Sequence, residues 1–384
     1  MSMHSNRANE LSERECNHYQ RHLSLPEVGI EGQLKLRNAS VLVVGAGGLG
    51  CPVLQYLTAV GVGRIGILDN DYVDASNLQR QVLFSAEDVG KFKAEIASQK
   101  LSQNNPFIVV DPIVERLNNE NVEQIFRSYS IVVDGSDNFE TRYLVNDACV
   151  MFRKVLIYGS IFQFHGQVSV FNYQKGPTYR CLFPESPGEA ALPNCSEVGV
   201  LGALPGVIGS IQALETIKII TGVGQPLSGK VLLYDALSQK TQTISLQSNP
   251  GNHRISVLPD SKNQCPSMNK PTEEIKEISP KDLKMMLKNS DNLHILDVRE
   301  RWERDQSRIE PSVHFPLAEF SSPTESFLAS LPMKNSKVIV YCKAGIRSMH
   351  ACRAMSSWGF NNLHNLMGGI DAWEKEDLVY SMDQ

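Results

Sequence analysis

The 384-residue sequence lacks the segments that would place a chain in a membrane, and it has little net charge. Its longest apolar stretch, from about residue 204 to residue 220, is interrupted by Gln212, Glu215 and Lys218, which argues against a transmembrane helix. Residues 1 to 20 are polar and contain no hydrophobic core of a signal peptide. A net charge of -5 gives no general attraction to nucleic acid or to acidic membranes. We therefore expect neither a membrane nor a nucleic acid as a partner.

Cysteine is present but follows no regular spacing. The eight cysteines are spread along the chain, and this distribution argues against a disulfide framework. Reduced thiols are typical of the cytoplasm, so we expect a cytoplasmic protein.

The order of apolar and polar residues predicts two α/β domains. From Ser40 to about residue 157, short apolar runs alternate with amphipathic stretches, which is typical of a parallel sheet covered by helices on both faces. Residues 167–171 alternate polar and apolar side chains, as an antiparallel strand would, so the sheet is expected to be mixed and mainly parallel. A long helix is expected from about 204 to 221, ended by Gly222.

A segment rich in proline, glycine and polar residues separates the two predicted domains. Residues 249–275 show little periodicity and are interpreted as a linker. The alternation of strands and helices then resumes over a shorter length. We predict a first domain over residues 1–248 and a second, small α/β domain over residues 276–384.

A glycine-rich turn at residues 45–50 indicates a nucleotide site. Gly45-Ala46-Gly47-Gly48-Leu49-Gly50 follows a predicted strand and opens a predicted helix, which is the context that a G-x-G-x-x-G motif requires. Gly45 permits the tight turn, Gly47 lets the backbone approach a phosphate, and Gly50 lets the helix pack on the strand. Asp69 ends the next strand, where an acidic side chain can bind a ribose hydroxyl.

Charged residues beyond this unit favour adenylyl transfer over the alternative, a nicotinamide-dependent dehydrogenase. Transfer of an adenylyl group requires cations at the phosphate oxygens and usually a carboxylate that holds Mg²⁺. Arg80 and Lys93 are suited to the first task and Asp137 to the second. A dehydrogenase would leave these three residues without a shared role.

Five ordered motifs resemble those of the E1-like adenylyltransferases of the MoeB/ThiF family, which activate ubiquitin-like sulfur carriers. The motifs are Gly45 to Gly50, Asp69-Asn70-Asp71, Ser76 to Gln81, Gly90 to Lys93, and Asp137-Asn138. The resemblance, over roughly residues 10 to 250, implies a Rossmann-like E1/ThiF fold, ATP and Mg²⁺ as cofactors, and adenylation of the C-terminal Gly-Gly carboxylate of the carrier. The nucleotide-site residues that it implies are Gly45, Gly47, Gly48, Asp69, Asp71, Ser76, Asn77, Leu78, Gln79, Arg80, Lys93, Asp137 and Asn138.

The same resemblance implies two further functional residues. Arg21 matches the arginine that family members insert into the ATP site of the partner subunit, which implies a homodimer. Cys195 matches a cysteine on the loop that crosses over the carrier's tail, where it could bond to the activated carrier or resolve a persulfide. The alternative for Cys195 is a small packed residue.

The structural zinc of many family members is not expected here. Those members hold the ion with two C-x-x-C pairs. This chain has Thr178 and Cys181 at the first pair, and Asn252 and Ile255 at the second. One thiolate does not hold the ion, so we predict no zinc; the sequence assigns no role to Cys181 or to Cys265.

A second loop, at residues 342–347, indicates sulfur chemistry. Cys342-Lys343-Ala344-Gly345-Ile346-Arg347 lies between a predicted strand and a predicted helix, so backbone N–H groups, the helix N-terminus and Arg347 favour a thiolate or a persulfide. The loop resembles the active loop of the rhodanese family over roughly residues 276 to 384. Supporting motifs, in family order, are Ile295 to Glu300, His314-Phe315-Pro316 and Gly368 to Trp373.

The two halves together resemble the fused adenylyltransferase/sulfurtransferases that are related to the enzymes activating molybdopterin synthase. The resemblance implies that ATP activates the carrier's carboxylate and that a Cys342 persulfide, loaded by a donor such as a cysteine desulfurase, yields a thiocarboxylate after reduction. Molybdopterin cofactor biosynthesis is the first expectation for the pathway. Thiamine, cysteine and tRNA-thiolation pathways use the same chemistry and stay open, as does a binding module in which both sites are inactive.

Overall fold

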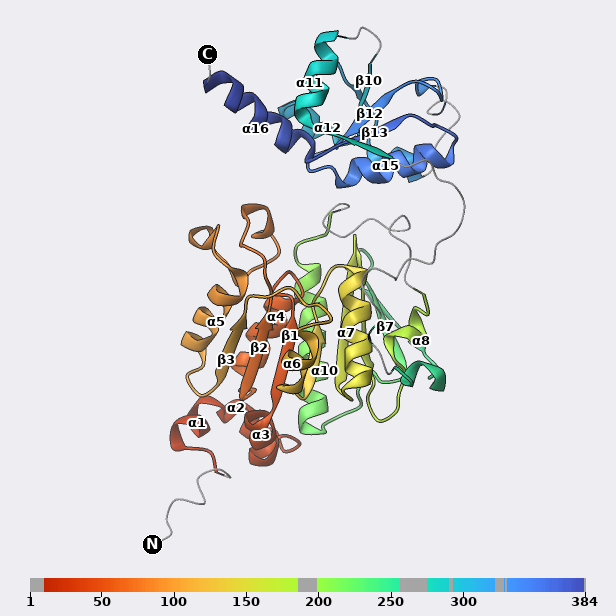
Figure 1. The fold of residues 1–384 in the computed structure, drawn as a ribbon. Helices are drawn as coiled ribbons and strands as arrows, with labels where there is room; N and C mark the ends of the chain where they lie inside the picture. Colours follow the sequence, from red (N-terminus) through yellow and green to blue (C-terminus); the bar gives the residue numbers. More distant parts are fainter. Residues whose placement is uncertain are drawn as a thin grey trace. The chain divides into compact units, whose positions relative to one another are not determined.

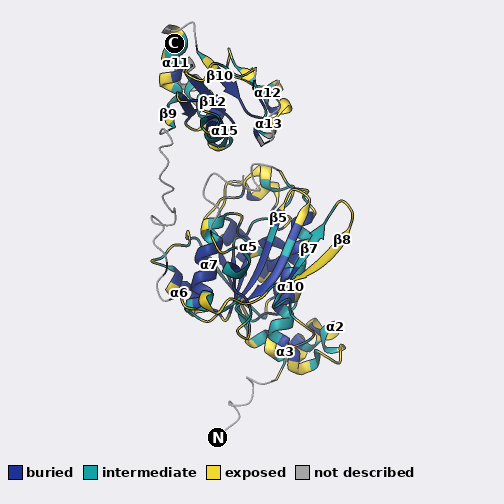
Figure 2. Ribbon diagram, turned by 90° about the vertical axis from the view of Figure 1, so that its right-hand side faces the viewer, coloured by how far each residue is buried: buried dark blue, intermediate teal, exposed yellow. Residues whose placement is uncertain are grey.

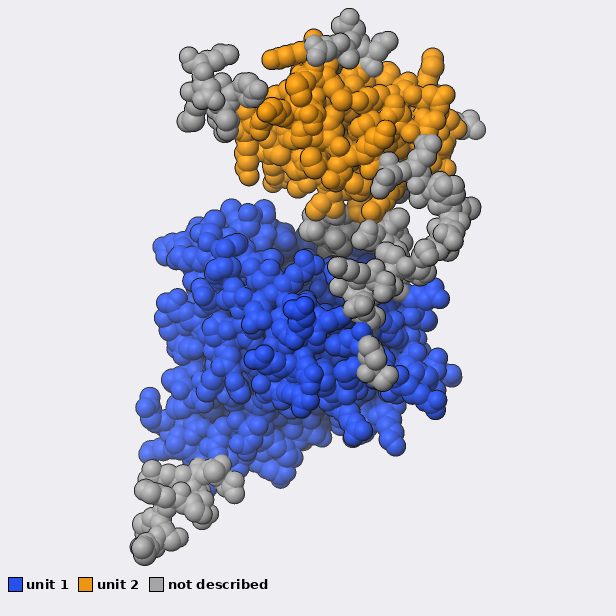
Figure 3. All heavy atoms as spheres, in the orientation of Figure 1, with its two compact units in different colours: residues 1–187, 194–266 blue, residues 188–193, 267–384 orange. Residues whose placement is uncertain are grey.

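The computed structural model describes residues 10–185, 199–255, 258, 275–289, 293–321, 328 and 330–382. These residues belong to two compact units, one up to residue 258 and one from residue 275 onward (Figure 3). None of the helices within these ranges combines the length and the apolar character that a bilayer crossing requires.

The first unit is built on an eight-stranded sheet in the order β3-β2-β1-β4-β5-β6-β7-β8. The pairs from β3 to β5 are parallel, and those from β5 to β8 are antiparallel. The predicted mixed and mainly parallel sheet is thus confirmed. The strands are β1 (Ser40–Val44), β2 (Arg64–Leu68), β3 (Val109–Ile113), β4 (Ile131–Asp134), β5 (Val155–Phe162), β6 (His165–Phe171), β7 (Lys230–Asp235) and β8 (Lys240–Ser245).

Helices cover both faces of this sheet (Figure 1). They are α1 (Glu13–His18), α2 (Gln20–Leu23), α3 (Gly29–Asn38), α4 (Gly50–Ala59), α5 (Lys93–Asn104), α6 (Val122–Arg127), α7 (Phe139–Met151), α8 (Tyr179–Leu182) and α10 (Leu204–Thr221). The long helix α10 has the predicted bounds, and it ends at Gly222, whose left-handed φ of 79° closes it.

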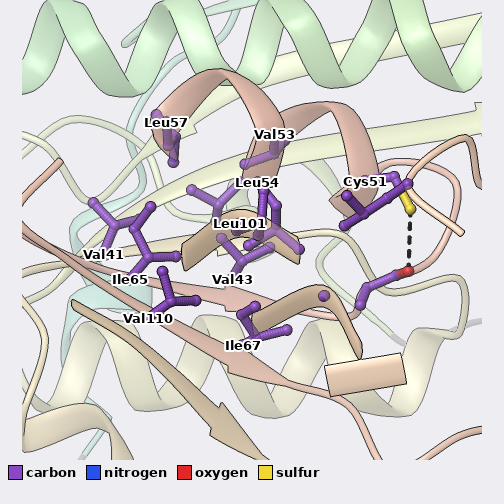
Figure 4. Close-up of a cluster of buried hydrophobic side chains, with 14 of the residues drawn as sticks. Val41, Val43, Cys51, Val53, Leu54, Leu57, Ile65, Ile67, Leu101 and Val110 are labelled. Carbon is purple, nitrogen blue, oxygen red and sulfur yellow. Dashed lines mark hydrogen bonds between the residues drawn. The ribbon is translucent and has the colours of Figure 1, made fainter. Parts of the chain in front are cut away.

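Alternation along β1 produces two separate cores. Val41 and Val43 pack with the apolar side chains of α4 and α5, as Figure 4 shows, whereas Leu42 and Val44 pack with those of α6 and α7. Because successive side chains of a strand point to opposite faces, an apolar strand needs cover on both sides. The edge strand β8 is exposed along its whole length, in contrast to the buried centre of the sheet (Figure 2).

The second unit is a five-stranded parallel sheet in the order β11-β10-β12-β13-β9. Its strands are β9 (Lys276–Ile278), β10 (His294–Asp297), β11 (Val313–His314), β12 (Val338–Tyr341) and β13 (Leu363–Leu366). Its helices are α11 (Pro280–Asn289), α12 (Arg301–Gln306), α13 (Leu317–Ser321), α15 (Ile346–Ser357) and α16 (Gly369–Met382). Apolar clusters lie on both faces of this sheet, so the prediction of a small second α/β unit is confirmed.

Candidate functional site

The glycine loop after β1 packs the first residue of α4 closely against the end of the strand. Gly45 has a φ of 91°, and its N–H donates to the carbonyl oxygen of Leu68 at 2.8 Å. A Cβ on Gly50 would lie 1.9 Å from the carbonyl oxygen of Gly45, so the helix packs too closely for any side chain there. A Cβ on Gly47, by contrast, would meet no atom nearer than 3.8 Å. The loop therefore leaves open space beside Gly47.

Asp69, at the end of β2, holds this loop in place. Its Oδ2 accepts the N–H of Ala46 at 2.7 Å, and its Oδ1 accepts the N–H of Asp71 at 2.8 Å. Burial raises the pKa of Asp69, although the ammonium of Lys93 opposes that shift.

A cavity of about 470 Å³ lies at the carboxyl ends of β1, β2 and β4. Parallel sheets bind ligands at this edge. The cavity brings together most of the predicted nucleotide residues, namely Gly45, Gly47, Gly48, Asp69, Asp71, Asn77, Arg80, Lys93, Asp137 and Asn138.

Three of the predicted nucleotide residues do not line this cavity. Ser76 is exposed and donates its hydroxyl to Asp74, and Leu78 packs against the core of the first unit. Gln79 lies against Gly202, where an added Cβ would be 2.3 Å from the Gln79 carbonyl oxygen.

The cations of the cavity are already held by local partners. Lys93, the first residue of α5, is 5% exposed, and its Nζ lies 3.0 Å from Oδ2 of the exposed Asp71. Arg80 donates from Nη1 to the carbonyl oxygen of Ser76 at 3.2 Å. Asn138 caps α7 by accepting the N–H of Thr141 at 2.9 Å. These side chains are therefore held by contacts within the first unit.

Several residues that line the cavity were not expected from the sequence. They are Glu115, Arg116 and Leu117 beyond β3, Ser136, Thr141 and Arg142 around the start of α7, and Gln81, Ile161 and Val200. Glu115, Arg116 and Leu117 could have been predicted from their position just after β3, because the carboxyl ends of parallel strands share one edge of the sheet.

A buried carboxylate lies beneath the Asp137 loop. Asp134 accepts the N–H and the hydroxyl of Ser136 at 2.9 and 2.6 Å, and the Asp134 side chain is inaccessible to solvent. Burial raises the pKa of Asp134, and the nearby guanidinium of Arg142 acts against that shift. These contacts fix the backbone on which Asp137 stands.

Arg21 is not among the residues gathered in the cavity. Arg21 is an exposed residue of α2, which packs on α3; α3 in turn leads into the amino end of β1 (Figure 1). The cavity lies at the opposite, carboxyl end of that strand, so Arg21 does not line the cavity of its own chain. Cys195 lies outside the described residues. The chain re-enters the described part beside the cavity, where Val200 forms a bridge with Gln163.

In the second unit, the Cys342 loop connects β12 to α15. The thiol is buried, and its Sγ accepts the N–H of Gly345 at 3.1 Å and the hydroxyl of Ser348 at 3.4 Å. Gly345 has a φ of 93°. A Cβ added to this residue would lie 3.1 Å from the carbonyl oxygen of Leu366. Lys343, Ala344 and Ile346 are exposed at the rim of the loop.

Arg347, the last residue of this loop, is engaged by Glu303 of α12. Its two terminal nitrogens each lie 2.6 Å from a carboxylate oxygen of Glu303. Burial raises the pKa of Glu303, but the hydrogen bonds from Arg347 and from its own capping contact with the N–H of Glu300, together with the charges of Arg347 and Arg299, outweigh burial and hold that pKa below its ordinary value. The hydrogen bond to Glu303 likewise raises the pKa of Arg347.

Hydrogen-bond donors surround Cys181, at the place where many family members bind zinc with two C-x-x-C pairs. Its Sγ accepts the N–H of Asn249 at 3.3 Å, the N–H of Thr178 at 3.4 Å and the side-chain amide of Asn252 at 3.5 Å. Burial raises the pKa of Cys181, but these hydrogen bonds outweigh it and the pKa is lowered. Within the described part of the chain, no three histidine, cysteine, aspartate or glutamate side chains are grouped to hold a metal. The absence of zinc stays a prediction, and Cys265 lies outside the described residues.

Comparison with known families identifies both units. Residues 19–255, more than half of the chain, match the ThiF family, and residues 279–376 match the rhodanese-like domain. The chain belongs to the ThiF family. Its second unit is a rhodanese-like domain, as predicted.

Named relatives of this ThiF family member resemble it over most of its length. The probable adenylyltransferase/sulfurtransferase MoeZ of Mycobacterium tuberculosis is 41% identical over 377 residues, covering 96% of this chain and 95% of the relative. The probable molybdopterin-synthase adenylyltransferase of Porphyra purpurea is 40% identical and covers 94% of this chain and 93% of the relative. The sulfur carrier protein adenylyltransferase of Thermus thermophilus is 51% identical over 244 residues, covering 62% of this chain and 90% of the relative.

A solved structure shares the fold. The crystal structure of E. coli MccB with ATP has a TM-score of 0.53 and 26% identity, covering 63% of this chain and 74% of that one. The predicted fold class is confirmed. The predicted enzyme class is confirmed as well: this ThiF family member is an adenylyltransferase with a sulfurtransferase domain, which excludes the dehydrogenase and the inactive binding module.

Proposed function

We propose that the chain binds ATP in the cavity at the glycine loop and adenylates the C-terminal Gly-Gly carboxylate of a ubiquitin-like sulfur carrier. A persulfide on Cys342 then converts the activated carboxylate into a thiocarboxylate. The observation that carries this proposal is the cavity itself, which gathers a glycine loop, Arg80, Lys93 and the carboxylate of Asp137 at one edge of a parallel sheet. The names of the Thermus thermophilus and Mycobacterium tuberculosis relatives support the substrate and the second reaction.

In the adenylation step, a carboxylate oxygen of the carrier attacks the α-phosphorus and the bond to pyrophosphate breaks. The N-terminus of α4 and the N–H groups of the glycine loop are suited to bind the phosphates. Lys93 and Arg80 neutralise charge as it develops on the phosphate oxygens. Lys93 would exchange its contact with the exposed Asp71 for one with ATP.

The residues of the cavity fit a magnesium ion bound together with ATP. Mg²⁺ prefers oxygen ligands and is usually held by one or two carboxylates together with substrate phosphates. Asp137 supplies such a carboxylate at the cavity wall. Mg²⁺ would add positive charge at the phosphate oxygens. Asn138, whose side chain caps α7, fixes the loop that carries Asp137.

In the sulfur-transfer step, the outer sulfur of the Cys342 persulfide attacks the acyl carbon. A carbon–sulfur bond forms, the bond to AMP breaks, and an acyl disulfide links the carrier to Cys342. A thiol then attacks Sγ of Cys342, and the thiocarboxylate leaves with the electron pair of the broken sulfur–sulfur bond. Cys195 or an external thiol serves as this reductant, and a cysteine desulfurase serves as the donor that loads Cys342.

The enzyme acts as a homodimer in this proposal, with Arg21 of each subunit completing the ATP site of the other. Two observations support a second copy of this chain as partner. Arg21 lies at the end of the sheet opposite its own cavity. The neighbouring helices α4 and α10 expose apolar side chains, with Tyr56 54% and Leu214 58% accessible. A planar guanidinium can bridge two phosphate oxygens across such an interface.

The product most directly serves molybdopterin cofactor biosynthesis. The name of the Porphyra purpurea relative supports this pathway. Thiamine, cysteine and tRNA-thiolation pathways are the alternatives, because each uses a carrier with the same terminal Gly-Gly.

The test is to incubate the enzyme, ATP, Mg²⁺ and a sulfur donor with candidate carriers and to determine the carrier mass. We expect replacement of one carboxylate oxygen by sulfur on one carrier. Asp137→Ala should lose both ATP–pyrophosphate exchange and product, whereas Cys342→Ala should lose only the product. Failure of every carrier to gain sulfur would refute the proposal.

A further inference from the structure

The hydroxyl of Ser348 lies between the sulfur of Cys342 and a buried amide. Ser348 is in the first turn of α15 and is inaccessible to solvent. Its Oγ lies 3.4 Å from Sγ of Cys342 and 2.7 Å from Oδ1 of Asn365 on β13, which is 3% exposed. A hydroxyl has one proton and donates to one acceptor at a time. The two acceptors therefore compete for the same proton.

Besides the N-terminus of α15, a thiolate at this position depends on hydrogen bonds that reach Sγ. Cys342 is 1% exposed, so bulk water solvates the sulfur poorly. The guanidinium of Arg347 is held by both carboxylate oxygens of Glu303, so its charge is largely balanced by that partner. The donors that contact Sγ directly are the N–H of Gly345 at 3.1 Å and the hydroxyl of Ser348. The hydroxyl is the one of these two that a substitution can remove.

We propose that Ser348 is a catalytic residue of sulfur transfer, whose hydroxyl donates to Sγ of Cys342 while that sulfur is a thiolate and to Asn365 while it carries an outer sulfur. Asn365 is a positioning residue that accepts the proton in the second state. This inference rests on the proposed persulfide at Cys342. It assigns the stabilisation of the thiolate to the neutral hydroxyl of Ser348 rather than to the charged guanidinium of Arg347.

Thiosulfate and cyanide isolate the two half-reactions in which the thiolate takes part. In loading, the thiolate of Cys342 attacks the outer sulfur of thiosulfate; the new sulfur–sulfur bond forms, and the old bond breaks with its electron pair leaving on sulfite. In discharge, cyanide attacks the outer sulfur, thiocyanate forms, and the electron pair returns to Sγ. The thiolate is the nucleophile of the first step and the leaving group of the second. A hydrogen bond to Sγ raises the fraction of Cys342 that is thiolate in the first step and stabilises the thiolate as it leaves in the second.

The experiment measures thiosulfate:cyanide turnover of the full chain in matched variants. Ser348→Thr and Ser348→Val add the same bulk and differ in the hydroxyl, so their ratio isolates the hydrogen bond from packing. We expect kcat to be roughly tenfold higher for Ser348→Thr than for Ser348→Val, equal to about 1.4 kcal/mol of barrier, with the KM for thiosulfate unchanged. Thermal unfolding of each variant reports on whether the second unit is folded, and ATP–pyrophosphate exchange reports that the first unit is unaffected.

Asn365→Leu separates competition from a structural role. It removes the acceptor that takes the proton in the persulfide state but leaves the hydroxyl that donates to the thiolate, so the loss of kcat should be smaller than for Ser348→Ala. A pair that matters only for packing would instead show equal losses for Asn365→Leu and Ser348→Ala.

Equal kcat values for Ser348→Thr and Ser348→Val would overturn the inference, as would equal losses for Ser348→Ala and Asn365→Leu. Cys342→Ala distinguishes this failure from failure of the proposed function. If Cys342→Ala is inactive while the two Ser348 variants are equal, the sulfur role of Cys342 stands and that of Ser348 does not. Activity retained by Cys342→Ala would refute both.

Discussion

Replacing Gly47 or Gly50 by alanine separates two reasons for glycine within one loop. At Gly50 an added Cβ would lie 1.9 Å from the carbonyl oxygen of Gly45, which is backbone and cannot rotate away. Such overpacking costs about 1–3 kcal/mol or more. For a domain of this size each kcal/mol lowers the thermal midpoint by roughly 2–4 °C, so we expect Gly50→Ala to lower it by about 2–12 °C.

At Gly47 the same change should leave the fold intact and weaken ATP binding. The nearest atom to an added Cβ is Nε2 of Gln81 at 3.8 Å, which is an ordinary contact. Stability should therefore change by no more than about 0.5 kcal/mol. The methyl would occupy cavity space, and loss of a backbone hydrogen bond to a phosphate is worth about 1.5–3 kcal/mol. We expect ATP affinity to fall roughly 10- to 100-fold.

Differential scanning fluorimetry measures the first effect, and ATP–pyrophosphate exchange over a range of ATP concentrations measures the second. Wild-type ATP affinity in Gly47→Ala would refute the reasoning that the backbone approaches the phosphate at this residue. A wild-type thermal midpoint in Gly50→Ala would refute the packing argument. If both variants lose stability equally, the loop has one structural role and the separation is wrong.

Three further predictions concern the dimer, the loop arginine and the thiols. Arg21→Ala and Asp137→Ala should each abolish ATP–pyrophosphate exchange. When the two variants are mixed and their subunits redistribute at random, half of the dimers contain one subunit of each kind and retain one intact site, so up to roughly a quarter of the wild-type activity should return. No recovery of activity would contradict the donation of Arg21 across the interface. Because the pKa of Glu303 is lowered in the folded state, its ionised form stabilises the fold above its ordinary pKa, and this contribution is lost on acidification. Between about pH 5 and pH 3 the thermal midpoint of wild type should therefore fall more steeply than that of Glu303→Gln, and parallel curves would argue against the pair. Iodoacetamide should alkylate Cys181, whose pKa is lowered, before Cys51, whose pKa burial raises to about 12; the opposite order in peptide mass spectra would contradict the hydrogen bonds assigned to Cys181.

The parts of the site that depend on local chain geometry could be predicted from the sequence. The interval between Gly45 and Asp69 is set by one helix and one strand, so the spacing along the chain already predicted that the carboxylate lies at the loop. In the structure that carboxylate accepts the N–H of Ala46 at 2.7 Å. The helix bounds at α10 followed in the same way from its closing Gly222.

Contacts between distant segments left no such signal. Glu303 and Arg347 are 44 residues apart, and neither belongs to a periodic pattern that would pair them. Their ion pair depends on how α12 packs beside the Cys342 loop, which is a property of the folded unit. Glu115, by contrast, lies just beyond β3, so the shared edge of a parallel sheet could have placed it at the cavity.

The hydrogen bonds around Cys181 join two segments 71 residues apart. The donors belong to the chain itself, so this join forms as the first unit folds. Because these hydrogen bonds lower the pKa of Cys181, they favour its thiolate, the form that oxidants attack, so oxidation of this one sulfur would break the join.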